Sequence, residues 1–270
     1  MKKEILMTAL AVSMLIACKK SDADTPAPGG QTTSCVPVPD IATNEDGDTS
    51  NAFFYNANTS NIGKIQDYDG DGGRNGYTLY SYSSGKITES DYYDNGNVNG
   101  DGSEYHLDNA GRVKMETYYE IFTASHDTIF FQYDANGNNT YRIHKSVGVN
   151  TTRDTTVYLY IGNTRVSSDK IKNGVSVQHH EYTYTANEDK VAYNTLLNDL
   201  PGRGLFGKIS TNLIAKDVFT DETGSSTDYT ATYTYEFDSN GYPVKVTYDV
   251  AAASGGISFS DVTKYKYMCR

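Results

Sequence analysis

The sequence is short of basic residues and contains no tryptophan. Its 23 Lys and Arg are outnumbered by 34 Asp and Glu, which gives a net charge of −11 at pH 7. A protein that binds nucleic acid must neutralise phosphates with clustered Lys and Arg, and the sequence shows no basic cluster. The composition therefore argues against nucleic acid as a partner.

Sequence signatures of catalysis are also missing. The chain has no G-x-S-x-G motif and no Gly-rich phosphate loop opening into a helix. His179 and His180 are adjacent on a predicted strand, so their side chains point to opposite faces. Carboxylate pairs are frequent, but nearly all of them lie in predicted turns. The sequence predicts that the chain is not an enzyme. None of the five histidines stands in a metal-binding spacing such as H-E-x-x-H: His106, His126, His144, His179 and His180.

No hydrophobic run is long enough to be a membrane-spanning helix, which needs about 20 apolar residues. The apolar stretch 5–17 follows a basic start and has the length of a signal-peptide core. It ends in Leu15-Ile16-Ala17-Cys18, which resembles a lipobox. This resemblance implies removal of residues 1–17 and lipidation of Cys18, so that acyl chains hold the protein to a membrane. The alternative is an ordinary signal peptide with a chance cysteine.

Residues 18–34 combine the predicted lipidated cysteine with a flexible tether rich in Pro, Gly, Ser and Thr. Lys19 does not resemble an inner-membrane retention signal. Asp22 and Asp24 faintly resemble the acidic export signal of Bacteroidetes surface lipoproteins. We therefore expect a lipid-anchored protein of the outer membrane, and surface display is left open. Residues 35–270 form a single predicted domain.

Only two cysteines remain besides Cys18: Cys35 and Cys269, at opposite ends of the predicted domain. Export to an oxidising compartment permits a disulfide between them. The sequence leaves two alternatives open, a Cys35–Cys269 bridge or two independent thiols, because it does not supply their separation.

What the sequence has in abundance is tyrosine, 24 residues, together with a repeated hairpin pattern. Glycines at 63, 85, 111, 137 and 162 follow one another at intervals of 22, 26, 26 and 25 residues. Asp or Asn initiates each turn, and Gly or Asn accepts positive φ. A period near 26 holds two strands and two turns. We expect an all-β, antiparallel up-and-down meander of about 14–16 strands.

The segments between the turns alternate between apolar and polar residues. Tyr233, Tyr235 and Phe237 share one face of a predicted strand, and Thr232 and Thr234 share the other. Alternation with a period of two indicates a sheet with one face in water.

Phe131-Gln132-Tyr133-Asp134-Ala135-Asn136-Gly137 is the best copy of a turn that loosely resembles the YD repeats of Rhs-type proteins. The lipobox, the early cysteine, the Tyr-rich hairpins and the terminal Tyr265-Lys266-Tyr267-Met268-Cys269 together resemble an uncharacterised family of Bacteroidetes lipoproteins with a porin-like fold. The resemblance implies a sheet that is curled into a barrel or half-barrel.

A barrel that spans a membrane needs an apolar outer band, and here charged residues recur in the middle of predicted strands. We therefore expect a water-soluble exterior and an interior of Tyr, Val, Ile and Phe, with an apolar or aromatic hollow. The charged residues are Lys114, Glu116, Arg142, His144, Lys245, Lys264 and Lys266.

One connection, residues 194–207, is longer than the others and rich in apolar residues. Residues 195–200 could form a short helix before Pro201. The loop is interpreted either as a lid over the hollow or as a hydrophobic cap that seals one end of the core. The apolar residues are Leu196, Leu197, Leu200, Leu205 and Phe206.

The only metal-like signal is acidic. Asp67, Asp69 and Asp71 alternate and are followed by Gly72, as in the opening of a calcium loop. Asp94 and Asp101 lie in the next hairpin, which should place them at the same end of the sheet. Thr78 stands where a helix–loop–helix calcium site has its Glu. The alternatives are a Ca²⁺ site and two solvated turns, and no other cofactor is expected.

Two functions remain. The chain is either a non-catalytic envelope module that binds a glycan, a lipid or a small apolar ligand through inward Tyr residues, or a structural or protein-interaction module without a small ligand.

Overall fold

The computed structural model describes residues 37–57, 59, 61–69, 73–120, 125–147, 153–190, 205–207, 210–253, 256 and 258–269. They belong to the unit Cys35–Arg270, one of the two units into which the chain divides. The described residues form sixteen strands and no helix. Accordingly, no helix among them has the length and hydrophobicity to cross a bilayer. The strands are β1 (Pro37–Thr43), β2 (Thr49–Tyr55), β3 (Ile62–Tyr68), β4 (Arg74–Ser83), β5 (Lys86–Tyr93), β6 (Val98–Leu107), β7 (Val113–Glu120), β8 (Ser125–Tyr133), β9 (Asn139–Val147), β10 (Arg153–Ile161), β11 (Thr164–Lys172), β12 (Val175–Glu188), β13 (Asn212–Asp221), β14 (Tyr229–Phe237), β15 (Pro243–Ala252) and β16 (Phe259–Cys269).

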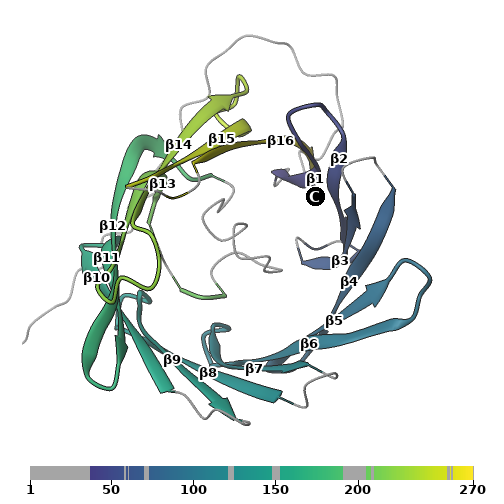
Figure 1. Ribbon diagram of the computed structural model, residues 1–270. Helices are drawn as coiled ribbons and strands as arrows, with labels where there is room; N and C mark the ends of the chain where they lie inside the picture. Colours follow the sequence, from purple (N-terminus) through teal and green to yellow (C-terminus); the bar gives the residue numbers. More distant parts are fainter. Residues whose placement is uncertain are drawn as a thin grey trace, which may run out of the picture. The chain divides into compact units, whose positions relative to one another are not determined.

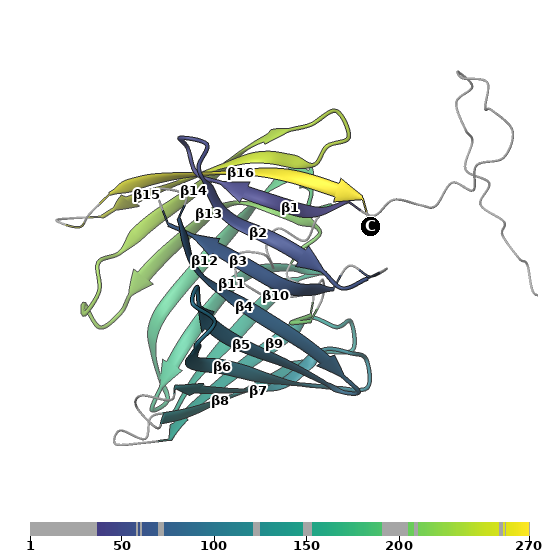
Figure 2. The same cartoon turned by 90° about the vertical axis from the view of Figure 1, so that its right-hand side faces the viewer.

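The strands form one closed antiparallel barrel in which every strand pairs with its neighbours in sequence (Figure 1). β1 closes the barrel by pairing with β16, for example through Ala42 opposite Tyr265. The strands run obliquely around the barrel (Figure 2), as closure of a sheet requires. The predicted all-β meander is confirmed, and the open choice between barrel and half-barrel is decided in favour of the barrel.

The turns at one end of the barrel repeat one hydrogen-bonding pattern. Asp108 Oδ1 accepts from the backbone N–H groups of Ala110 and Arg112 at 2.8 and 2.9 Å. Gly111 follows with a φ of 79°, a conformation that costs little without a Cβ. Asp134 with Gly137 and Asp238 with Gly241 repeat this pattern. The predicted Asp-to-Gly turns are therefore confirmed at these three places, whereas Gly63 lies within β3.

Acid should weaken these turns. Although burial alone would raise the pKa of Asp108, hydrogen bonds from Arg112 and Ala110 and the charge of Arg112 hold this pKa below its ordinary value. A carboxyl whose pKa is lower in the folded state stabilises the fold fully above its unfolded pKa of about 3.9 and loses this effect as pH falls through the folded pKa. We expect Asp108→Asn to melt at a lower temperature than the wild type at pH 6. The two melting temperatures should converge towards pH 2. A difference in melting temperature that stays constant from pH 6 to pH 2 would show that the ionised Asp108 carboxylate does not stabilise the fold.

Two groups of buried side chains make up the core inside the barrel. The larger cluster belongs to β3–β8, and the smaller one is centred on Leu213 and Val246. Its partly buried neighbours include Tyr233, Tyr235 and Phe237, so the predicted aromatic face of this segment lies inside. The buried members of the larger cluster are Ile62, Ile65, Tyr80, Ile87, Tyr105, Val113, Ile129 and Phe131.

The inner face of the sheet carries charged residues that were expected on the outer face. Glu116, Arg142 and His144 were expected on the polar exterior, but they lie on the inner face. Cross-strand pairing places Glu116 and His144 opposite Ile129, and Arg142 opposite Phe131. The physical reason is hydrogen bonding. His144 Nε2 lies 3.0 Å from Asp127 Oδ2, and Ser103 Oγ donates to Glu116 Oε1 at 3.3 Å, so these two side chains have partners inside the barrel.

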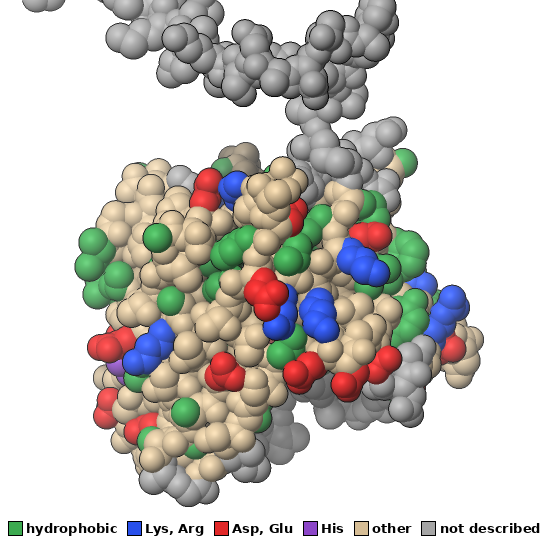
Figure 3. Space-filling view, turned by 90° about the horizontal axis from the view of Figure 1, so that it is seen from above, with side chains coloured by type: hydrophobic (Ala, Val, Ile, Leu, Met, Phe, Trp, Pro, Cys, Tyr) green, Lys and Arg blue, Asp and Glu red, His purple; other side chains and the backbone are tan. Residues whose placement is uncertain are grey.

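The outer face carries charged pairs as well. Lys245 Nζ contacts Glu236 Oε1 at 2.7 Å, and His179 Nδ1 contacts Asp169 Oδ1 at 2.7 Å. On the side seen in Figure 3, acidic and basic side chains are scattered among hydrophobic ones. Polar residues thus interrupt the apolar surface on this face.

Candidate functional site

A cavity of about 550 Å³ lies along the inner wall formed by β1–β5 and β16. Its volume falls within the range of ligand pockets, about 300–1,000 Å³. Closure of the barrel creates this cavity, because β16 is far from β2–β5 in sequence and reaches them only by pairing with β1. The described lining residues are Ala42, Ser50, Asn51, Phe53, Ile62, Ile65, Asp67, Thr78, Tyr80, Glu89, Asp91, Asp261, Thr263 and Tyr265.

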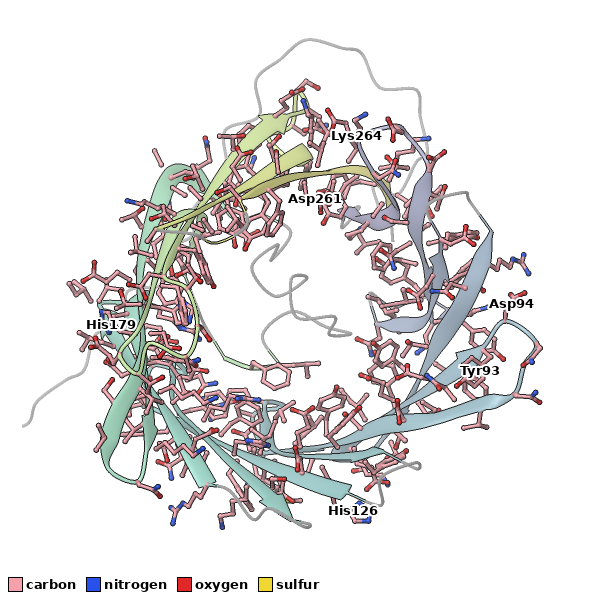
Figure 4. All side chains as sticks on the ribbon, viewed as in Figure 1. Tyr93, Asp94, His126, His179, Asp261 and Lys264 are labelled. Atoms are coloured by element: carbon pink, nitrogen blue, oxygen red, sulfur yellow. The ribbon has the colours of Figure 1, made fainter. Side chains whose placement is uncertain are left out.

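One part of the lining is acidic. Four carboxylates, those of Asp67, Glu89, Asp91 and Asp261, line the cavity, and its described lining contains no Lys, Arg or His. Figure 4 shows Asp261 pointing into the barrel and Lys264 pointing away from it. The cavity therefore presents hydrogen-bond acceptors and negative charge to whatever enters it.

Neutral donors hold three of these carboxylates in place. Thr78 Oγ1 donates to Asp91 Oδ1 at 2.7 Å, and Asn51 Nδ2 donates to Asp67 Oδ1 at 2.7 Å. Each pair sits on neighbouring strands, so the sheet register fixes its position.

Tyr105 orients the third carboxylate, since its hydroxyl donates to Glu89 Oε2 at 2.7 Å. Burial, followed by the negative charges of Glu89 and Glu116, raises the pKa of Tyr105, so the hydroxyl keeps its proton and acts as a donor.

The surroundings of Asp91 shift the pKa of its carboxyl upward. Burial and the negative charge of Asp101 raise its pKa, whereas the hydrogen bond from Thr78 opposes this shift. Asp91 therefore takes up a proton at a higher pH than an ordinary aspartate.

The remainder of the lining is aromatic and aliphatic. Phe53, Tyr80 and Tyr265 contribute rings from β2, β4 and β16, and Ile62 and Ile65 come from β3. Carboxylates beside aromatic rings can accept hydrogen bonds from hydroxyl or ammonium groups while the rings cover the apolar faces of the same ligand. Ser50 Oγ donates to the backbone oxygen of Ala42 at 3.1 Å.

The expectation that the chain is not an enzyme stays a prediction.

Of the predicted calcium ligands that the structure describes, only Asp67 lines this cavity. Asp69 Oδ1 accepts from the Gly73 N–H group at 2.6 Å in the β3–β4 turn. Asp94 lies in the β5–β6 turn, outside the barrel wall in Figure 4. Asp101 lies in β6, and Asp71 is outside the described residues.

Among the residues that the structure describes, no three His, Cys, Asp or Glu are grouped so that they could hold a metal ion. The Ca²⁺ site stays a prediction. The two acidic turns do share one end of the barrel, opposite the Asp-to-Gly turns.

The described part of the loop 194–207 packs into the core. The ring of Phe206 meets those of Phe131 and Tyr105 edge-on, with centroid distances of 4.8 and 6.2 Å. Leu205 O accepts from the Val113 N–H group at 2.6 Å. These contacts fit the cap interpretation, although the lid interpretation concerns the whole loop and is not tested by them. The predicted short helix and three of the leucines lie outside the described residues: Leu196, Leu197 and Leu200.

The cysteine predictions are also untested. Cys18 and Cys35 lie outside the described residues. Cys269 ends β16, where its backbone pairs with Pro37, but its side chain is not among those described. Lipidation of Cys18 and the Cys35–Cys269 bridge therefore stay predictions.

Sequence reasoning missed most of the cavity. Glu89 and Asp91 stand two residues apart on a predicted strand, a spacing that places them on one face. Asp261 carries no comparable signal, because only closure of the barrel brings β16 to the same cavity.

Two solved structures have a similar fold. A porin-like protein from Bacteroides uniformis ATCC 8492 has a TM-score of 0.61 at 16% identity, over 88% of this chain and 98% of that protein. A porin-like protein from Bacteroides vulgatus ATCC 8482 has a TM-score of 0.50 at 14% identity, over 86% of this chain and 99% of that protein. At this identity the likeness shows the fold alone.

No protein-family model and no curated protein matches the sequence. The porin-like fold implied by the sequence resemblance is confirmed. Membership of a lipoprotein family and the YD-type repeat stay predictions.

Proposed function

We propose that this chain is a non-catalytic lipoprotein of the bacterial cell envelope that binds a glycan inside its barrel. The observation that carries the proposal is the lumen cavity, which combines four carboxylates with three aromatic rings. Sugars present hydroxyl groups at their edges and C–H groups on their faces. The carboxylates of the cavity can accept hydrogen bonds from the sugar hydroxyl groups, and its aromatic rings can pack against the C–H faces.

The negative charge of the cavity narrows the range of glycans that it could bind. A sugar that carries an amine would gain from the carboxylates of Asp67, Glu89, Asp91 and Asp261, and a neutral sugar would use them as acceptors. A uronic acid would meet charges of its own sign in a partly enclosed space. An acyl chain is disfavoured too, since it would desolvate carboxylates without bonding them. Neutral and amine-bearing glycans fit best.

The proposed location combines two observations. Cys18 stands in a lipobox-like segment, which predicts a lipid anchor. The charged pairs Lys245–Glu236 and His179–Asp169 on the outer face would be costly in the hydrocarbon region of a bilayer. We infer that the barrel faces water while the N-terminal lipid holds it to the outer membrane, with surface display as a variant of this location.

A protein-interaction module is the second candidate. Leu159 and Ile161 on β10 are 59% and 73% exposed, and exposed apolar groups can mark a contact surface. Substituting both with Ser should weaken association with a protein partner and leave binding of glycans unchanged.

The binding proposal is tested by titration calorimetry on the full chain at pH 7. The probes are oligosaccharides of glucose, glucosamine and galacturonic acid. We expect glucosamine oligomers to bind best, glucose oligomers more weakly, and galacturonic acid oligomers not at all. Asp91→Asn should weaken binding of glucosamine oligomers about tenfold or more, because it removes a charged acceptor from the cavity.

Asp94→Asn is the matched control, because it makes the same change of charge in an exposed turn next to β5. It should bind like the wild type. If no oligosaccharide binds at millimolar concentration, or if both variants bind equally well, the proposed glycan site is wrong.

A further inference from the structure

A second set of aromatic side chains lines the inner wall of β12–β16, outside the cavity. Asp261 faces the interior, and its cross-strand partner is Tyr248. Tyr248 in turn lies opposite Tyr233. Directly opposite residues of paired strands share a face, so both tyrosines face the interior.

The same reasoning applies to the neighbouring strands. His179 points outward in Figure 4, so the next residue, His180, points inward. His180 lies opposite Phe219, which lies opposite Tyr229. We call this set the aromatic wall: His180, Tyr182, Phe219, Tyr229, Tyr233, Tyr248 and Phe259.

The rings of the aromatic wall contact one another in two groups, one around Phe219 and one around Tyr248. Phe219 and Tyr229 stack with centroids 4.8 Å apart and an interplanar angle of 21°. Tyr233 and Tyr248 have centroids 4.9 Å apart, and Phe259 follows Tyr248 at 5.8 Å. Tyr233 and Tyr248 are only partly buried, so part of each ring remains accessible from the interior.

A carboxylate lies within this set of rings. His180 Nδ1 lies 2.9 and 3.1 Å from the two carboxylate oxygens of Asp217. Burial and the charge of Asp217 raise the pKa values of Tyr182 and Tyr229 to about 12, so both hydroxyls keep their protons. The wall therefore offers donors, acceptors and ring faces together.

The aromatic wall adjoins the cavity. β15 and β16 are paired, with Tyr248 of the wall opposite Asp261 of the cavity lining, and Val246 opposite Thr263 of the same lining. A ligand held by the carboxylates of the cavity and extending around the inner face would next meet Tyr248 and Tyr233.

We propose that the aromatic wall is a second sugar subsite, so that the ligand is a linear oligosaccharide that spans the cavity and the wall. This inference rests on the glycan binding proposed above and specifies the length of the glycan. An acyl chain fits the wall poorly, because it would cover the His180–Asp217 pair and the tyrosine hydroxyls without bonding them. Sugar rings would stack on Tyr233 and Tyr248 while their hydroxyls bond Asp217 or His180.

The test measures affinity against chain length. Glucosamine oligomers of one to six units are titrated into the full chain by calorimetry at pH 7. We expect the affinity to rise about tenfold or more between two and five units, as further sugars reach the aromatic wall. Tyr248→Ala should remove this gain, weakening five-unit binding about tenfold and leaving two-unit binding unchanged. Tyr248→Phe keeps the ring and should keep most of the gain.

Thr247→Ala is the matched control, since Thr247 precedes Tyr248 in β15 and its side chain is on the opposite face. It should behave as the wild type at every length. Tyr248→Phe provides a second measurement if the alanine variant fails to fold, because a Tyr248→Phe protein that loses the length dependence as well would contradict stacking.

Failures of the two proposals have different signatures. Binding that does not grow with length, or an equal loss for short and long oligomers in Tyr248→Ala, would overturn the second subsite alone. Absence of binding by every oligomer would overturn the glycan site and the subsite together. Weakening of all lengths by Asp91→Asn, with length dependence retained, would support both.

Discussion

Replacing Ile87 with alanine is expected to lower the free energy of unfolding by about 3 kcal/mol. Ile87 is 2% exposed and belongs to the larger core cluster. It lies opposite Tyr82 on one neighbouring strand and Tyr105 on the other. The pairing of three strands fixes these neighbours, so they cannot collapse into the space that the side chain leaves. The loss therefore includes the cost of a cavity as well as the lost burial. Urea unfolding followed by far-UV circular dichroism measures it.

Thr88→Ala is the control, because Thr88 is the next residue on β5 and occupies the other face. Its substitution should change the free energy of unfolding by less than about 0.5 kcal/mol. Similar losses for Ile87→Ala and Thr88→Ala would show that the face assignment of β5 is wrong.

Replacing Phe206 with alanine is expected to lower the free energy of unfolding by about 2–3 kcal/mol, the low end for a core aromatic because Phe206 is only partly buried. Its ring meets Phe131 and Tyr105 edge-on, and such aromatic pairs contribute beyond their burial. The substitution also distinguishes the two interpretations of the loop 194–207. A cap predicts lost stability, measured by urea unfolding.

A lid predicts a different outcome for the same variant. Stability would stay at the wild-type value, and the rate at which oligosaccharides bind would change. Phe206→Leu is the conservative companion, since it keeps an apolar side chain against the cluster. It should lose less stability than Phe206→Ala, and an equal loss in the two variants would show that the ring contacts are unimportant.

The parts of the fold that were predictable are those governed by local chemistry. Asp108 and Asp134 form their turns with backbone groups within four residues, so the turn residues themselves indicate the hairpins. The alternation around Tyr233 and Tyr235 is also local, because successive side chains of a strand point to opposite faces. Together these signals predicted the antiparallel meander.

The inner and outer faces were harder to assign where both carry polar residues. Glu116, Arg142 and His144 were placed outside, because a charged residue within a strand normally faces water. Inside this barrel, however, His144 contacts Asp127, and Asp127 belongs to a different strand. Asp127 offsets the cost of placing His144 inside the barrel, but the residues next to His144 in sequence give no sign of this partner.

The candidate site depended on the tertiary structure most of all. Asp91 and Glu89 could be placed on one face from their spacing, but nothing near them in sequence points to Asp261 or Tyr265. The aromatic wall likewise joins His180 to Phe259 through four strand pairings. The residues of the cavity and of the aromatic wall could be identified only from the order of the strands around the barrel.

The sequence by itself determined an all-β chain of repeated hairpins, because turn formation and side-chain alternation act over two to five residues. Closure of the barrel was decided by the tertiary structure alone, through the pairing of β1 with β16. That pairing joins residues more than two hundred positions apart, and its free energy comes from backbone hydrogen bonds that almost any residue can make. The side-chain sequence therefore gives little indication of this pairing. The same pairing brings carboxylates and tyrosines from distant strands together in one site.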